Sequence, residues 1–261
     1  MAKIIAFVNQ KGGVGKTTTT INIGRYLADF GKKVLLVDLD PQGNASSGLG
    51  VDARSREKNL YHAMVLGLDP KELIVTTPAQ GLHLIPAAQD LAGAEIEMVH
   101  LEGREFRLYY VLRQLRPYYD YILIDSPPSL GLLTVNGLVA SDEVIIPVQT
   151  EYYALEGLSQ LVKTINLVKD NLNPNLEIEG IVMTMADFRT NLTQEVINEV
   201  KKHFADKVYK TVIPRNIRLS EAPGFGKPIF LYDKESEGAK KYLELTREFL
   251  IINTSSSPVT A

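Results

Sequence analysis

A glycine-rich segment near the amino end of the chain has the residue types and spacing of a phosphate-binding loop. Residues 9–18 read Asn-Gln-Lys-Gly-Gly-Val-Gly-Lys-Thr-Thr and lie between an apolar run and a helix-length segment. Glycines let a backbone fold around phosphate oxygens with its N–H groups pointing inward, and the helix that follows adds its dipole. We expect Lys16 to reach the β- and γ-phosphates of a nucleotide and the Thr17 hydroxyl to ligate Mg²⁺.

A second lysine distinguishes this segment from the usual phosphate loop. The usual pattern has glycine at position 10, where this chain has Gln10, and the extra lysine follows as Lys11. Lys11 cannot easily fold back onto phosphates that its own loop already encloses. A second cation near the γ-phosphate therefore suggests charge supplied across an interface between two chains, as an arginine finger does in trans.

Three aspartates stand at the ends of predicted strands, on the ligand side of an open α/β sheet. Asp40 follows a strand and opens a turn, where its carboxylate could orient the water that attacks the γ-phosphorus. Asp38, two residues earlier, points the same way and could support Mg²⁺ through water. Asp125 ends the apolar run 121–124 in the Walker B arrangement, in which a carboxylate lies beside Mg²⁺, usually through a water.

Residues 11–18, Lys-Gly-Gly-Val-Gly-Lys-Thr-Thr, resemble the deviant Walker A motif of the ParA/MinD superfamily of P-loop ATPases. The likeness continues in Val-Asp-Leu-Asp-Pro-Gln-Gly-Asn (37–44) and Asp-Ser-Pro-Pro-Ser (125–129). It extends to Glu-Tyr-Tyr-Ala-Leu-Glu-Gly (151–157) and Ile-Pro-Arg-Asn-Ile-Arg-Leu-Ser-Glu-Ala-Pro (213–223). Together these segments are similar to the chromosomal ParA/Soj branch, over about residues 3–250.

The resemblance implies an ATPase that uses ATP and Mg²⁺ as a switch in DNA segregation. It gives Lys11 a role across an ATP-sandwich homodimer, Asp40 the water-orienting role, and Pro214 and Asn216 the contacts to adenine. It also implies nonspecific binding of the dimer to double-stranded DNA on the nucleoid, and a ParB/Spo0J-like partner that stimulates hydrolysis and release. The residues expected around the nucleotide are Lys11, Gly12, Gly13, Val14, Gly15, Lys16, Thr17, Thr18, Pro214 and Asn216.

Short apolar runs alternate with helix-length segments along most of the chain. Most runs are continuously apolar, which is typical of parallel strands covered on both faces. We therefore expect an α/β fold with a doubly wound, mostly parallel sheet flanked by helices, as in P-loop NTPases of the deviant Walker A type. The expected strands are 3–8, 33–38, 82–85, 119–125, 143–148 and 178–184, and the clearest helices are 17–30, 106–115, 155–171, 193–204 and 237–252.

Length and composition limit the class of protein further. The 261 residues are 45% hydrophobic and 23% charged, enough for one sizeable core, so residues 1–252 are expected to form a single ATPase domain and 253–261 a polar, disordered tail. The absence of cysteine excludes disulfides, thiolate zinc sites and iron–sulfur ligation. The first residues lack a signal-peptide pattern, so we expect a cytoplasmic location.

Charge is unevenly distributed. The formal net charge is −3, yet residues 189–247 hold 12 basic and 8 acidic side chains. This segregation favours a polyanionic partner, and nonspecific DNA binding needs phosphate neutralisation rather than base-reading motifs. The expected DNA contacts are first Lys201, Lys202, Arg215 and Arg218, and then Arg189 and Lys227.

Relatives of this fold perform other tasks. A nitrogenase-type iron protein is excluded because it needs cysteines, and a small-molecule ligase would not need Lys11. A MinD-like membrane ATPase ends in a basic amphipathic helix, whereas this chain ends in uncharged residues 254–261, so we expect no direct membrane insertion. Positioning of another cargo, such as a carboxysome or a chemoreceptor cluster, stays open as an alternative.

Overall fold

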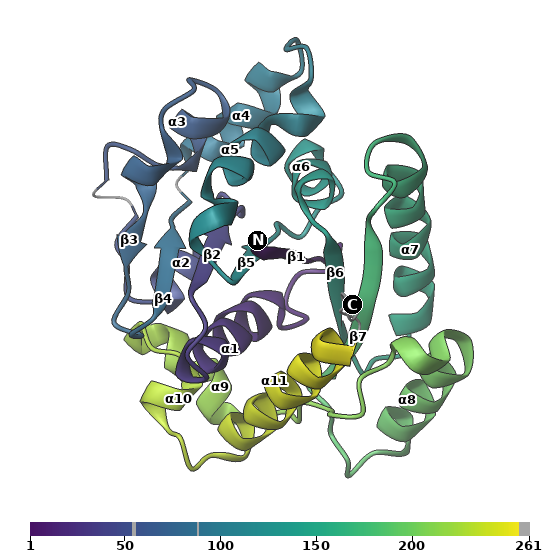
Figure 1. Cartoon of the computed structure of the whole chain (residues 1–261). Coiled ribbons are helices and arrows are strands. Elements are labelled where there is room, and N and C mark those ends of the chain that lie inside the picture. Colours follow the sequence, from purple (N-terminus) through teal and green to yellow (C-terminus); the bar gives the residue numbers. More distant parts are fainter. Residues whose placement is uncertain (54–55, 88, 256–261) are drawn as a thin grey trace, which may run out of the picture.

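The computed structural model describes residues 1–53, 56–87 and 89–255, and within these residues seven strands form one sheet (Figure 1). The strand order is β3-β4-β2-β5-β1-β6-β7, and every neighbouring pair is parallel except β3 and β4. The predicted α/β fold with a mostly parallel sheet is therefore confirmed.

The strands are short and the helices vary widely in length. The strands are β1 (Lys3–Phe7), β2 (Val34–Asp38), β3 (Val75–Thr76), β4 (Leu82–Ile85), β5 (Tyr121–Asp125), β6 (Glu143–Gln149) and β7 (Glu177–Thr184). The α-helices are α1 (Lys16–Asp29), α2 (Asn44–Gly48), α3 (Leu60–Met64), α4 (Asp90–Met98), α5 (Arg107–Leu115), α6 (Leu132–Ala140), α7 (Ala154–Asn171), α8 (Asn191–Phe204), α9 (Ile217–Glu221), α10 (Ile229–Tyr232) and α11 (Glu237–Ser255).

Alternate residues of the central strands enter two separate cores, one on each face of the sheet. In β1, Ile4 packs into the core that contains Leu158 of α7, while Ile5 packs into the core that contains Leu27 of α1 and Phe249 of α11. All five side chains are almost wholly buried. This two-sided burial explains why the strand sequences are continuously apolar instead of alternating.

Helices α1 and α11 lie side by side on one face of the sheet (Figure 1). Two buried hydrogen bonds join them: Tyr26 Oη donates to the Ala239 carbonyl at 2.8 Å, and the hydroxyls of Thr19 and Tyr242 lie 3.0 Å apart. The helix that starts at the phosphate loop, α1, is thus held by the carboxyl-terminal helix, α11.

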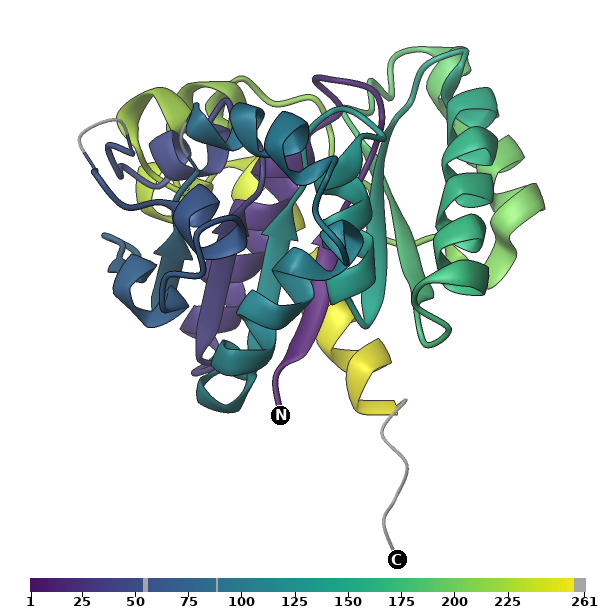
Figure 2. The same ribbon diagram turned by 90° about the horizontal axis from the view of Figure 1, so that it is seen from above.

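Figures 1 and 2 both place α7 and α8 beside β7, at the opposite end of the molecule from β3.

Several elements differ from the sequence expectation. Strand β3 and the short helices α2, α3, α9 and α10 were not predicted, nor were α4 and α6. Helix α11 continues to Ser255, so the predicted start of the tail at residue 253 is wrong, and 256–261 lie outside the described residues. Lys3 of β1 donates a hydrogen bond to the Asn253 side chain, which itself donates to the Phe249 carbonyl at 2.9 Å.

None of the helices that the structure describes is long and apolar enough to cross a membrane.

Candidate active site

The phosphate loop leaves the carboxyl end of β1 and ends at the first turn of α1. Gly13 and Gly15 have φ angles of 75° and 84°, in the left-handed region where a side chain is strained. Gly15 is the N-cap of α1, and its carbonyl accepts the first helical hydrogen bond from Thr19 N at 2.9 Å. Residues 12–17 therefore wrap around the positive end of a helix, which is the geometry that binds anions.

Lys16 is a buried cation in this loop. The residue is 7% exposed, and its Nζ donates a hydrogen bond to the Lys11 carbonyl at 3.3 Å. Burial lowers the pKa of Lys16, while the charges of Asp125 and Asp40 act in the opposite direction. An ammonium group that has left water for this loop can bind a polyphosphate strongly, because the surrounding dielectric is low.

The two strand-end carboxylates Asp38 and Asp125 are neighbours in the sheet, since β2 and β5 pair them directly. Thr17 Oγ1 donates to Asp125 Oδ2 at 2.7 Å, and Thr20 Oγ1 donates to Oδ1 at 3.2 Å. Burial raises the pKa of Asp125, and the Thr17 hydrogen bond opposes that rise. Thr20 was not among the predicted site residues, although its place one turn after Lys16 could have indicated it.

The side chains of Thr17 and Asp125 are suited to bind Mg²⁺ together with the phosphates of a nucleotide. Mg²⁺ is commonly bound through one or two carboxylates, waters and substrate phosphates, without an all-protein cage. The hydroxyl of Thr17 and the carboxylate of Asp125 are adjacent, and a cation there would favour the charged form of the buried carboxyl. Among the described residues no group of three or more His, Cys, Asp or Glu could hold a metal alone.

Asp38 fixes the loop that follows β2. Its Oδ2 accepts hydrogen bonds from both Ser46 N at 2.8 Å and Ser46 Oγ at 2.7 Å, so it ties β2 to α2. Burial raises the pKa of Asp38, and the charge of Asp125 adds to the rise. No residue pattern indicates the Ser46 contacts, which make Asp38 a support for the loop that carries Asp40.

Asp40 lies at the start of that loop and is 5% exposed. Its Oδ1 accepts Gln42 N at 3.0 Å, and its carbonyl accepts Gly43 N at 2.9 Å, so the chain turns tightly behind it. Asp40 and Asp125 are close enough for their charges to influence Lys16. The structure thus brings together Lys16, Thr17, Asp40 and Asp125 at the carboxyl edge of the sheet.

Lys11 is oriented differently from Lys16. Its side chain is 54% exposed and forms an ion pair with Glu151, in the turn before α7. Its ammonium group donates to Glu151, whereas the ammonium group of Lys16 donates to the Lys11 carbonyl. The two lysine ammonium groups therefore have different partners.

A cavity of about 460 Å³ joins the phosphate loop to the predicted base-binding segment. Its walls include Gly15 and Thr18 from the loop side and Pro214 and Asn216 from the other. Asn216 Oδ1 caps α9 by accepting Leu219 N at 3.3 Å. Four of the ten predicted nucleotide residues therefore meet across one cavity, although the two pairs are about 200 positions apart in the sequence.

The carboxyl end of β7 completes this cavity and was missed by the sequence analysis. Thr184 Oγ1 donates to the Val14 carbonyl at 2.8 Å and so holds the phosphate loop. Met185 follows with φ of 52°, an uncommon conformation for a residue other than glycine. Strained backbone next to a ligand cavity is frequent in functional sites.

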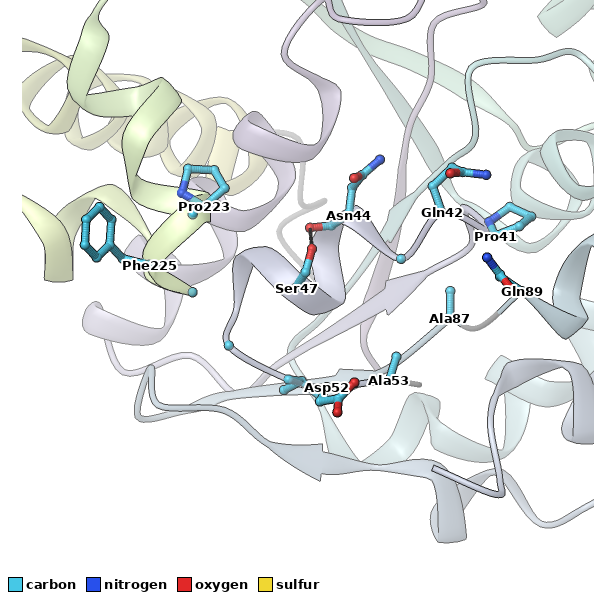
Figure 3. A pocket seen from close by; sticks show the side chains of 15 residues that line it. Pro41, Gln42, Asn44, Ser47, Asp52, Ala53, Ala87, Gln89, Pro223 and Phe225 are labelled. Atoms are coloured by element: carbon cyan, nitrogen blue, oxygen red, sulfur yellow. Dashed lines mark hydrogen bonds between the residues drawn. The ribbon is translucent and has the colours of Figure 1, made fainter. Parts of the chain in front are cut away.

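A hollow of about 870 Å³ shares Pro223 with the nucleotide cavity, and its described lining includes no residue of the phosphate loop (Figure 3). Figure 3 shows Gln42 and Asn44, from the loop after Asp40, on one side and Pro223 and Phe225 on the other. None of the described residues that line it is basic. The buried cation Lys16 lies instead in the phosphate loop.

The predicted DNA contacts fall into two groups, which α11 separates in Figure 1. Lys201 and Lys202 are in the last turn of α8, whereas Arg218 is in α9 on the other side of α11. Lys201 lines a cavity of about 810 Å³ together with three further cations, Lys207, Lys210 and Arg247. The expected single patch is therefore two surfaces.

Two of the arginines are already paired. Arg189 donates two hydrogen bonds to Asp187, at 2.8 and 2.6 Å, and Arg218 pairs with Glu221 at 2.9 Å and Asp233 at 3.4 Å. Of the remaining candidates, Arg215 lines the nucleotide cavity and Lys227 is exposed after the turn 222–225.

Comparisons with known proteins agree with this site. A family model described as an AAA domain matches residues 2–178. The chain is 60% identical over 248 residues to the sporulation initiation inhibitor protein Soj of Bacillus subtilis, covering 95% of this chain and 98% of that protein. It is 52% identical over 258 residues to the chromosome partitioning protein ParA of Myxococcus xanthus, covering 99% of this chain and 91% of the other.

Solved structures share the whole fold. A Mycobacterium smegmatis protein named cobyrinic acid a,c-diamide synthase, with bound ATP analogue and magnesium, is 36% identical with a TM-score of 0.87, covering 98% of both chains. The cell division ATPase MinD of Pyrococcus furiosus is 27% identical with a TM-score of 0.80, covering 97% of this chain and 100% of that one. The phosphate loop, the paired strand-end carboxylates and the near full-length matches to Soj and ParA show that this chain belongs to the Soj/ParA family of chromosome-partitioning ATPases.

Proposed function

We propose that this chain is an ATP-hydrolysing switch of DNA segregation that acts as an ATP-bound sandwich dimer. The dimer binds double-stranded DNA nonspecifically, and a ParB/Spo0J-like centromere-binding protein stimulates hydrolysis and release. The observation that carries the proposal is the orientation of Lys11, which is exposed and turned from its own phosphate loop toward Glu151. In this position its charge is available to a second chain.

Exposed apolar side chains at the same edge of the sheet support a dimer. Tyr152 and Tyr153 follow β6, Phe188 follows β7, and Ile217 follows the base-binding segment. These side chains are between 62% and 76% exposed. Apolar groups that gather around a charged site commonly mark a protein interface, and here the surface that faces a second copy also carries the nucleotide.

The roles of the residues follow from their positions. Lys16 and the N–H groups of residues 12–17 bind the phosphates, Thr17 and Asp125 hold Mg²⁺, and Asp40 orients the attacking water. Mg²⁺ supplies charge neutralisation at the β- and γ-phosphates when it is bound. Lys11 of the other chain completes the charge around the γ-phosphate, so hydrolysis requires the dimer.

Replacing Lys11 with alanine should leave ATP binding by the monomer within about two-fold of the parent, because Lys16 and the loop backbone stay in place. ATP-dependent dimerisation and hydrolysis should be lost, since the charge acts in trans. Size-exclusion chromatography with ATP and a phosphate-release assay measure both. A dimer of the Lys11→Ala protein in ATP would contradict the role across the interface.

DNA binding depends on cations that are not neutralised within the chain. Lys201, Lys207, Lys210 and Arg247 have no ion pair with another described residue, unlike Arg189 and Arg218. A few phosphate contacts give weak nonspecific affinity, roughly 10⁻⁴ to 10⁻⁶ M at physiological salt. A dimer places two such surfaces on one body, and therefore binds more tightly than the monomer.

We expect sequence-independent DNA binding by the Asp40→Ala protein in ATP and much weaker binding in ADP. The double substitution Lys201→Glu and Lys207→Glu should lower the affinity about ten-fold or more and flatten the dependence on salt. The matched control is Lys32→Glu with Lys33→Glu, two exposed lysines between α1 and β2. Fluorescence anisotropy with duplex DNA across a salt series measures this. Equal binding in ATP and ADP would refute the switch.

The partner and the location follow from the same proposal. A ParB/Spo0J-like protein should raise the hydrolysis rate only when DNA and ATP are both present, and the ATP form should be found on the nucleoid. The membrane alternative predicts ATP-dependent sedimentation with anionic lipid vesicles, and positioning of another cargo predicts no stimulation by a ParB-like partner. These two assays separate the three proposals.

A further inference from the structure

Gln10 stands where an ordinary phosphate loop has glycine, and its side chain reaches out of the loop to α7. Its Nε2 lies 3.3 Å from the Gly157 carbonyl in the first turn of α7, and also 3.3 Å from Gln160 Oε1. A glycine at position 10 could form neither hydrogen bond.

The residues on both sides of Gln10 are fastened to the same part of the fold. Asn9 Nδ2 donates to the Pro147 carbonyl of β6 at 2.7 Å, and Asn9 Oδ1 accepts Lys11 N at 2.9 Å. Lys11 forms its ion pair with Glu151, between β6 and α7. Three consecutive residues therefore attach to β6, to α7 and to the turn between them.

This attachment divides the loop into two parts with different neighbours. Residues 9–11 line a cavity of about 310 Å³ with Glu151, Tyr153 and Gly157, and Val14 reaches the same cavity, while Gly15 and Thr18 line the nucleotide cavity. Within the described chain, the backbone of residues 12–15 forms no hydrogen bond to β6 or α7 and can close around phosphates. The Lys11 side chain is thus paired with Glu151, and Lys11 is not among the described residues that line the nucleotide cavity.

We propose that Gln10 is a positioning residue for Lys11. Its hydrogen bond to α7 keeps the segment 9–11 in the conformation that presents Lys11 to a second chain. This inference rests on the proposed role of Lys11 across the dimer interface and adds a residue to it.

Fixing the segment in advance favours association, because a loop that is already ordered loses less entropy when the dimer forms. Gln10 also takes part twice in each dimer, once in each chain. The effect of losing it should therefore appear in the dimerisation constant and not in the affinity of the monomer for ATP. A residue that merely supported the phosphate loop would change both the dimerisation constant and the affinity of the monomer for ATP.

The test uses Gln10→Met in the Asp40→Ala background. Methionine keeps nearly the same length and volume but donates no hydrogen bond. Sedimentation velocity over a protein concentration series in ATP should show a dimer about ten-fold weaker than the Asp40→Ala parent, because the segment 9–11 is no longer held by Gln10 in either chain and loses more freedom on association. Calorimetry at concentrations where the protein is monomeric should give an ATP affinity within about two-fold of the parent. Gln194→Met, on the exposed side of α8, is the matched control and should change neither value.

A second measurement uses turnover in the chain that retains Asp40. Because the defect lies in association, the Gln10→Met protein should reach the parent's rate per chain when its concentration is raised about ten-fold. A rate that stays low at every concentration would overturn the proposal, and so would an unchanged dimerisation constant or a weakened ATP affinity of the monomer. If the Asp40→Ala parent itself does not dimerise in ATP, the dimer proposal fails before Gln10 is tested.

Discussion

Replacing Asp40 with alanine is expected to slow ATP hydrolysis about 100-fold or more while ATP-dependent dimerisation persists. The carboxylate lies at the carboxyl end of β2 and is held by Gln42 N at 3.0 Å, in a place where it can orient a water. Phosphate contacts come from Lys16 and the loop backbone, which the substitution leaves intact. Hydrolysis is slowed while ATP binding is unchanged, so the ATP-bound dimer has a longer lifetime.

Phosphate release and size-exclusion chromatography, both with ATP, measure the two halves of this prediction. Asp52→Ala is the matched control, since Asp52 lies on the same side of the molecule, after α2, and lines the neighbouring cavity. The control should hydrolyse ATP at the parent's rate. Normal turnover by the Asp40→Ala protein would show that another group orients the water.

The sequence was sufficient to predict the sheet because its central strands are buried on both faces. Each residue of β2, for example, is buried whichever way it points, so a continuous apolar run identifies the strand. The two residues of β3 carry no such pattern, since they pair antiparallel at the edge and are half-buried or exposed. Short helices such as α2 and α9 span about one turn, too little for a helical period to show.

The candidate site was predictable where a residue's role depends on local sequence. Gly15, Lys16 and Thr17 act through one loop, and Asp125 through the end of one strand, so spacing along the chain indicated them. Contacts between distant segments were not predictable in the same way. The Ser46 hydrogen bonds to Asp38, the Thr184 bond to Val14 and the Gln10 bond to α7 depend on how separate elements meet.

Charge was the least reliable guide from sequence alone. The 12 basic residues of 189–247 suggested one surface, but ion pairs within the chain change which of them can meet a phosphate. Arg189 and Asp187 are two positions apart, so their pairing could have been anticipated. Arg218 also pairs with Asp233, fifteen positions away, and only the fold brings these side chains together.

Replacing Lys16 with alanine is expected to weaken ATP binding about 100-fold or more, the largest effect on affinity of any single substitution considered. Lys16 is the buried cation of the loop, at 7% exposure, and its Nζ has a backbone carbonyl as its hydrogen-bond acceptor. When it is removed, the phosphates meet the charges of Asp40 and Asp125 without a compensating cation. Electrostatic repulsion between the carboxylates and the phosphates is then added to the loss of the hydrogen bond from the charged Lys16 to the phosphates.

Calorimetric titration with ATP and magnesium measures this loss, with the Lys11→Ala protein as the matched lysine control that should still bind. The melting temperature without nucleotide separates lost binding from lost folding. Burial lowers the pKa of Lys16, so keeping it charged costs free energy and its removal should not unfold the chain. A folded Lys16→Ala protein that binds ATP as tightly as the parent would mean that the phosphates lie elsewhere, and the site built here around α1 would be wrong.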